Sequence, residues 1–147
     1  MKLRPRDVIS YQGTDYVVEG ILAYKLGAKT HRLARAVDGD RVIWVEPLMD
    51  DADDRLLLFR EVKDLPVGTP PPATISYKGA SYLPRFSGTA TVDLDGVVSG
   101  RAAGTCELWR YRGAGDVFLQ IEKWPTGAVV LLGESVHKDM VDIYPAP

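Results

Sequence analysis

Two glutamates that lie next to tryptophans are the residues of this 147-residue chain whose types and spacing could do chemistry. Glu46 follows Trp44 by two positions, and Glu122 precedes Trp124 by two. Side chains two positions apart share a face of a β-strand, so each carboxylate is expected beside an indole ring, with Phe118 on the face of Glu122. A carboxylate against an aromatic wall can have a raised pKa and act as an acid, or can hold a cationic ligand together with the ring.

A structural role explains the same pattern. A glutamate at a strand end commonly accepts hydrogen bonds from turn amides or pairs with an arginine, here Arg32, Arg35 or Arg110. An open cleft shared with the tryptophans would favour cation binding, whereas burial of both glutamates against amides or arginines would remove that interpretation. No catalytic residue is assigned. The candidate ligand-binding or partner-binding residues are Trp44, Glu46, Phe118, Glu122 and Trp124.

The other reactive side chains do not form a recognisable site. His31 and His137 are far apart, without a cysteine or acidic partner at metal-ligand spacing. The acidic run between Asp50 and Asp54 lacks the glycine and terminal glutamate of a calcium-binding loop, which favours a solvated loop. Cys106 has no neighbouring histidine and is expected to be a buried or half-buried thiol. Nucleotide-binding and hydrolase motifs are absent from the sequence, so we predict neither a metal nor a cofactor.

Composition limits the classes of function. Hydrophobic residues make up 46% and charged residues 26% of the chain, as in a globular protein, and the net charge is -2. Residues 1–69 hold 11 basic and 12 acidic side chains and residues 70–147 hold 7 and 8, a balance that disfavours nucleic-acid binding. No apolar run is long enough to span a bilayer, and the N-terminus lacks the apolar core of a signal peptide. With a single cysteine, which fits a reducing compartment, we predict a cytoplasmic protein.

The elements that position the glutamates are organised by a repeat. The stretch Ile9-Ser10-Tyr11-Gln12-Gly13-Thr14-Asp15-Tyr16 returns as Ile75-Ser76-Tyr77-Lys78-Gly79-Ala80-Ser81-Tyr82. We name this pattern, Ile-Ser-Tyr-x-Gly-x-x-Tyr, the hairpin signature, because it predicts a short strand, a glycine-centred turn and the start of a second strand. A larger set of aromatic residues, with nearby arginines, could be stacking platforms for single-stranded nucleic acid, but aromatics at alternate strand positions more often fill a barrel core. The set comprises Tyr11, Tyr16, Tyr24, Tyr77, Tyr82, Trp109 and Tyr111.

Alternation and turn signals predict ten strands. Residues 54–65 could form a short capped helix, but their counterpart in the second copy, 129–136, is rich in β-branched residues, so we predict strands. Residues 31–37 also allow a helix, although the tight turn after them favours a strand. The tail, 139–144, fits an edge strand or a helical turn. Thirty residues separate Tyr16 from Glu46 and forty separate Tyr82 from Glu122, with the surplus around residues 99–104.

These elements predict an all-β fold with two tandem, pseudo-symmetric small antiparallel β-barrels of SH3-like character. The first module spans residues 1–65, a proline-rich linker residues 66–72, and the second module residues 73–147. Each copy has one strongly apolar face and too few residues to cover it, so the two barrels are expected to pack face to face as one compact unit.

The ordered set of motifs resembles a bacterial family. The two hairpin signatures, Ile43-Trp44-Val45-Glu46 and Leu119-Gln120-Ile121-Glu122-Lys123-Trp124 are similar to those of the domain-of-unknown-function family numbered 4178, over nearly the whole chain. The resemblance implies a bacterial, intracellular protein outside the membrane, often encoded near aminopropyltransferase-like and membrane-stress genes. It implies no catalytic residues.

The leading functional prediction is a non-enzymatic interaction or scaffold module of the bacterial cytoplasm, linked to membrane-stress or polyamine-related systems. It would bind a protein partner, or itself, through exposed sheet edges and its tryptophan-bearing surfaces. The alternative is an accessory protein that binds a polyamine-like cation in paired Glu/Trp pockets. A hydrolase or transferase would rest on the two carboxylates alone.

Overall fold

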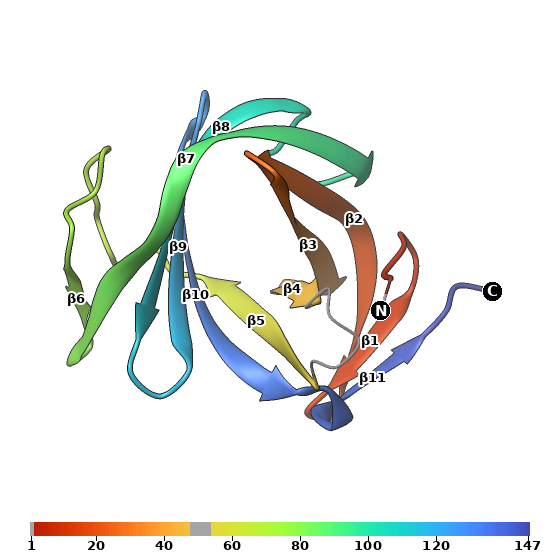
Figure 1. Ribbon diagram of the computed structural model, residues 1–147. Helices are drawn as coiled ribbons and strands as arrows, with labels where there is room; N and C mark the ends of the chain where they lie inside the picture. Colours follow the sequence, from red (N-terminus) through yellow and green to blue (C-terminus); the bar gives the residue numbers. More distant parts are fainter. Residues whose placement is uncertain (1, 48–53) are drawn as a thin grey trace.

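The computed structural model describes residues 2–47 and 54–147, which form eleven strands and one short 3-10 helix (Figure 1). The first half of the chain holds β1 (Val8–Tyr11), β2 (Thr14–Leu26), β3 (Lys29–Asp38), β4 (Arg41–Pro47) and β5 (Arg55–Glu61). The second half holds β6 (Ile75–Tyr77), β7 (Ala80–Gly96), β8 (Gly104–Gly113), β9 (Val117–Trp124), β10 (Gly127–His137), η1 (Lys138–Met140) and β11 (Val141–Tyr144).

Eight of these strands close into one antiparallel barrel. The strands form a single sheet in the order β11-β1-β2-β3-β4-β5-β10-β9-β8-β7-β6, and β2 also pairs with β7. The ring therefore runs from β2 through β3, β4, β5, β10, β9 and β8 to β7 (Figure 1). Closure leaves no unpaired edge within the ring itself.

The prediction of two small barrels packed face to face is not confirmed, because the two halves join edge to edge. β5 of the first half pairs with β10, and β2 pairs with β7 from Gly20↔Gly96 to Lys25↔Thr91. Each half thus supplies four strands to the ring and satisfies the free backbone groups of the other half. The segment between Glu61 and Ile75, which contains the predicted linker, connects β5 to β6 without a strand.

Most of the individual elements agree with the sequence predictions. Residues 31–37 lie within β3, and the ambiguous segment after Asp54 is β5. The tail combines both predicted alternatives, because the 3-10 turn η1 is followed directly by the edge strand β11. Both hairpin signatures form two-residue turns in which Gln12-Gly13 and Lys78-Gly79 have positive φ angles, as a type I′ turn requires.

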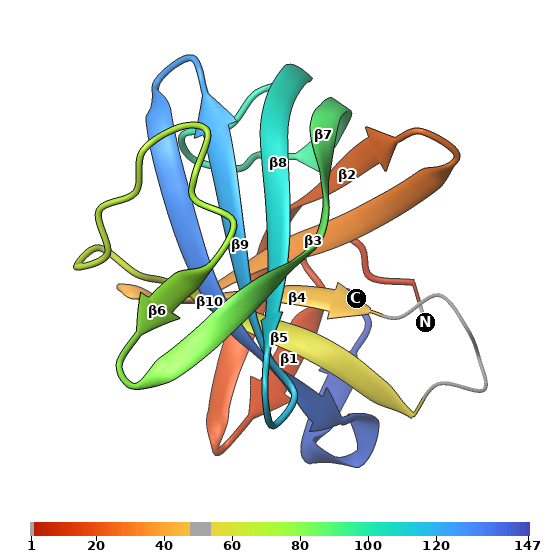
Figure 2. The same cartoon turned by 60° about the vertical axis from the view of Figure 1, so that its left-hand side comes forward.

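Three apolar clusters fill the structure. The interior of the barrel receives buried side chains from all eight ring strands, among them Leu22, Leu33, Phe59, Val92, Leu108 and Leu131. Outside the ring, β1 and β11 cover one face through Ile9, Tyr11 and Val141. The β6 strand and the chain before it cover another face over β9 and β10 (Figure 2), where Ile75 packs with Leu119, Ile121 and Val130. Five of the seven aromatic residues weighed as stacking platforms are buried, as a core role requires: Tyr11, Tyr16, Tyr24, Tyr82 and Tyr111. Tyr77 and Trp109 are half-buried.

The connection between β7 and β8 folds onto the ring at the β2–β7 seam. Val98 of this connection is 3% exposed and packs with the interior cluster. Its close approach depends on Gly20, because a Cβ atom there would lie 2.7 Å from the carbonyl oxygen of Val97 and from Cγ2 of Val98. The seam glycine therefore brings the connection, including Arg101, over the tryptophans of the interior.

Candidate functional site

The five candidate residues lie on the interior side of the barrel. Trp44 and Glu46 of β4 are 2% and 5% exposed, and Glu122 and Trp124 of β9 are 0% and 4% exposed. Phe118 is partly buried against the same interior cluster. The predicted sharing of faces along each strand is therefore confirmed, but the tryptophans are core residues and do not form the expected tryptophan-bearing surface.

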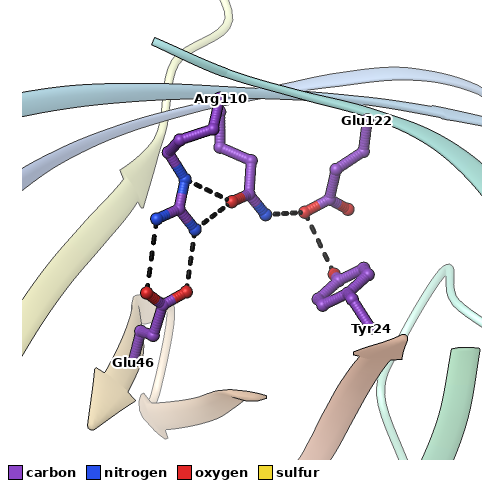
Figure 3. Close-up of polar contacts among 5 residues, drawn as sticks. Tyr24, Glu46, Arg110 and Glu122 are labelled. Carbon is purple, nitrogen blue, oxygen red and sulfur yellow. Dashed lines mark hydrogen bonds and ion pairs between the residues drawn. The ribbon is translucent and has the colours of Figure 1, made fainter. Parts of the chain in front are cut away.

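Glu46 is paired with a buried arginine. Nη2 of Arg110 donates to Oε1 of Glu46 at 2.8 Å, and Nη1 donates to Oε2 at 3.3 Å, so the guanidinium fork meets the carboxylate with both arms (Figure 3). Arg110 is 4% exposed, and its guanidinium lies 5.1 Å and 5.3 Å from the ring centres of Phe59 and Phe86. The sequence named Arg110 as one of three possible partners, and the fold selects it.

Glu122 accepts hydrogen bonds from three side chains. The donors are Nε2 of Gln120 at 2.7 Å, the hydroxyl of Tyr24 at 3.0 Å and Nε1 of Trp124 at 2.7 Å. Burial, together with the negative charge of Glu122, raises the pKa of Tyr24 well above its usual value, so its hydroxyl keeps the proton that it donates. The Glu122 carboxylate is thus held by fixed donors.

Gln120 joins the two glutamates into one network. Its Oε1 accepts from Nε of Arg110 at 2.8 Å and also from Nη2, while its amide nitrogen donates to Glu122. The polar chain runs from Glu46 on β4 through β8 and β9 to Tyr24 on β2 (Figure 3). Because both carboxylates are buried and already have donors, the arrangement gives no support to cation binding at paired Glu/Trp pockets.

Arg101 is the member of this region that sequence reasoning missed. It belongs to the β7–β8 connection, and its side chain is 6% exposed. Its guanidinium carbon lies 4.7 Å from the ring centre of Trp44 and 5.9 Å from that of Trp124, and its Nε is 3.6 Å from Oε1 of Glu122. The sequence feature that could have indicated Arg101 is the surplus of residues around positions 99–104. Extra residues in one half of a repeated sequence can carry a function that the other half lacks.

A polar pocket of about 370 Å³ opens beside Arg101. It includes side chains of β3, β4 and β5 and of the connections that follow β5 and β7. Basic residues outnumber acidic ones in its lining, which comprises Arg35, Asp40, Val42, Trp44, Arg60, Glu61, Lys63, Ser99 and Arg101.

His31 lies near the Glu46–Arg110 pair, on the other side of Phe86, whereas His137 is the last residue of β10. His31 stacks on Phe86 with ring centres 4.7 Å apart, and Nε2 of His137 lies 3.1 Å from Oδ2 of Asp54. Asp50, Asp51 and Asp53 of the acidic run fall outside the described residues. Within residues 2–47 and 54–147, no three His, Cys, Asp or Glu side chains are grouped as metal ligands.

We expect the Cys106 thiol to be unreactive in the native protein. Burial, with a smaller contribution from the charge of Glu122, raises the pKa of Cys106 to about 12, so almost no thiolate exists near neutral pH. Ellman's reagent at about pH 8 should label the unfolded chain rapidly, because the thiol pKa returns to about 8.5 on unfolding, and the native chain only at its rate of opening. Immediate stoichiometric labelling of the native protein would contradict this burial.

Comparison with known proteins identifies relatives of this chain but no assigned activity. A family model described as Domain of unknown function (DUF4178) matches residues 4–138. An uncharacterized protein of Mycobacterium bovis and two of Mycobacterium tuberculosis are each 27% identical over 153 residues, covering 99% of this chain and 73% of the relative. No solved structure matches. Among the described residues, no helix has the length and apolar character needed to cross a membrane. The match over most of its length shows that this chain belongs to the DUF4178 family.

Proposed function

We propose that this chain is a non-enzymatic interaction module that assembles with a second copy of itself through an apolar row at the mouth of the barrel. The row is defined by Tyr144, Val8, Val17, Val37 and Val42, one from each of β11, β1, β2, β3 and β4. Pairing places them in direct succession: Val8↔Tyr144, Val8↔Val17, Val17↔Val37 and Val37↔Val42.

The exposure of this row is the observation that carries the proposal. Tyr144 is 54% and Val17 is 44% exposed, and the other three side chains are half-buried. Their neighbours in sequence, such as Ile9 and Val18, point to the opposite face and pack under the β1–β11 pair. β7 pairs with β2 only from Gly20 onward, so it does not extend along β2 as far as Val17. A contiguous apolar row of this kind, with two exposed members, marks an interaction surface more often than scattered apolar residues do.

Charges beside the row favour a second copy as its occupant. On one side lie the exposed carboxylates of Asp15 and Asp142, each two positions from a member of the row. The other side leads past Val42 to Arg60 and Lys63 of the polar pocket. A twofold axis along the row would set the acidic side of each copy against the basic side of the other, the self-complementarity that an isologous interface requires.

Sedimentation velocity tests this assembly directly. The wild-type chain should dimerise reversibly with increasing concentration, and Val17→Lys should weaken dimerisation by about tenfold or more, because burial of a valine stabilises by about 1.5 kcal/mol. The matched control is Leu83→Lys, which places the same charge at a 58% exposed residue of β7 outside the row. A monomeric wild type, or equal effects of the two variants, would contradict the proposal. If a photo-crosslinker at position 17 captured a different protein and not a second copy, the occupant of the row would be that protein and the proposal of self-assembly would be wrong.

We also infer that the barrel consists of two equivalent halves that arose by duplication. The repeated hairpin signatures, with matching positive φ angles at their turns, support this inference. So does the pairing scheme, because β1 to β5 and β6 to β10 follow each other in mirrored order around the sheet. In this scheme Glu46 and Glu122 are equivalent carboxylates, while Arg101 belongs to the second half alone.

A further inference from the structure

Arg101 carries a buried positive charge whose hydrogen-bonding capacity is incompletely used. The side chain is 6% exposed, yet neither Nε nor Nη2 has a hydrogen-bond partner among the described residues. A guanidinium has five donor hydrogens in a planar fork, and burying it without acceptors is unfavourable. The arginine therefore requires a further explanation beyond its contacts with Trp44 and Trp124.

Glu122 does not fully provide that explanation. Its nearest approach to Arg101 is 3.6 Å, between Oε1 and Nε, which is too long for a good hydrogen bond. Its oxygens already accept from Gln120, Tyr24 and Trp124. Glu122 offsets part of the charge of Arg101 through space, but among the described residues Nε and Nη2 still lack a hydrogen-bond acceptor.

The pocket beside Arg101 has the charge and size for a small anion. Its four cations, Arg35, Arg60, Lys63 and Arg101, face two carboxylates, Asp40 and Glu61. Arg35 is paired with Glu19, which is not part of the lining, so Arg60, Lys63 and Arg101 face Asp40 and Glu61 with an excess of one positive charge. The volume of about 370 Å³ lies within the range of roughly 300–1,000 Å³ typical of small-molecule sites.

We propose that this pocket binds a phosphate group, either as inorganic phosphate or on a small phosphate monoester, with the buried Arg101 fork as its anchor. Arginine matches phosphate oxygens with two parallel hydrogen bonds, and Arg60 and Lys63 at the rim add charge that attracts a dianion. Trp44 and Trp124 flank the guanidinium, so occupation of the fork changes the surroundings of two fluorophores. This site adjoins the apolar row, with which it shares Val42.

Titration with inorganic phosphate and with glycerol 3-phosphate tests the proposal. At a protein concentration where the chain is monomeric, each should give a saturable change in tryptophan fluorescence and a rise in Tm, while chloride at matched ionic strength gives neither. Tighter binding of glycerol 3-phosphate would identify a monoester as the ligand, and tighter binding of inorganic phosphate would identify the free ion. Absence of saturable binding by both would overturn the site. Because apolar-row variants are not involved, this outcome is independent of the dimerisation experiment.

Substitutions locate the anion. Arg101→Gln should weaken phosphate binding by about tenfold or more, since a hydrogen bond to a charged group contributes about 1.5–3 kcal/mol. Arg60→Gln and Lys63→Gln, which change rim residues and should preserve the fold, should each weaken it several-fold even if Arg101→Gln does not fold. The matched control is Arg85→Gln, an exposed arginine of β7 outside the pocket. Equal affinity in the Arg60, Lys63 and Arg85 variants would show that phosphate does not bind here.

Discussion

Replacing Arg110 with methionine is expected to lower the free energy of unfolding by about 3–5 kcal/mol, because it leaves the carboxylate of Glu46 buried without its cation. Arg110 is 4% and Glu46 is 5% exposed, so water cannot take over the lost hydrogen bonds without opening the barrel. The same change removes two donors from Gln120, which connects the arginine to Glu122. Urea denaturation followed by tryptophan fluorescence measures the loss.

The matched control is Arg112→Met on the same strand. Arg112 pairs with Asp116 at 3.0 Å, but both side chains are about half exposed, at 44% and 53%, so its loss should cost less than about 1 kcal/mol. The double variant Glu46→Gln/Arg110→Met should recover part of the stability, because it removes the unpaired charge. Similar losses for Arg110→Met and Arg112→Met would argue against a buried ion pair.

Gly133→Ala is expected to lower the free energy of unfolding by about 1–3 kcal/mol through overpacking of the barrel. Gly133 of β10 lies opposite Phe59 of β5, and a Cβ atom there would be 2.9 Å from Cγ of the ring and still closer to two other ring atoms. Phe59 is fully buried in the interior cluster, with the Arg110 guanidinium 5.1 Å from its ring centre, so a shift of the ring would disturb packed neighbours. Thermal and urea denaturation both report this loss.

Two further variants separate this clash from a general effect of replacing glycine. A Cβ atom at Gly68 would meet no atom within 4 Å, so Gly68→Ala should change stability by less than about 0.5 kcal/mol. Phe59→Leu shortens the clashing side chain, so the double variant Phe59→Leu/Gly133→Ala should be more stable than the sum of the two single losses predicts. If the losses of the two single variants simply added, the Phe59 ring would not be the cause of the stability loss in Gly133→Ala.

The filled interior bears on where ligands can bind. Eight-stranded barrels can hold a small ligand inside or fill the interior with side chains, and this barrel follows the second pattern around its Glu46–Arg110–Gln120–Glu122 network. The two proposed sites accordingly lie beside this filled interior, and both include Val42. The extra residues of the β7–β8 connection give the second half of the chain a feature that the first half lacks.

Much of the local structure could be predicted from the sequence, because strand alternation and turn chemistry depend on neighbouring residues. The repeated hairpin signature indicated both turns, and period-two spacing placed Trp44 with Glu46 and Trp124 with Glu122 on shared faces. The comparison of residues 54–65 with residues 129–136 also favoured a strand for the segment after Asp54, which is β5. These signals extend over a few residues, and they hold whichever strands become neighbours.

Only the tertiary structure decided which edges join. Five strands with two free edges can close on themselves or pair with another five, and the alternation of apolar and polar residues is the same in both cases. The pairs β5–β10 and β2–β7 show that the two halves form one shared barrel. Because of this pairing, the inward faces of both halves line one interior, where the two glutamates are buried. The same pairing brings Arg110 of the second half to Glu46 of the first. It also placed Arg101 between two tryptophans that lie 57 positions before it and 23 positions after it in the sequence. Contacts over such separations depend on strand register and barrel closure, which residue types and their spacing do not specify.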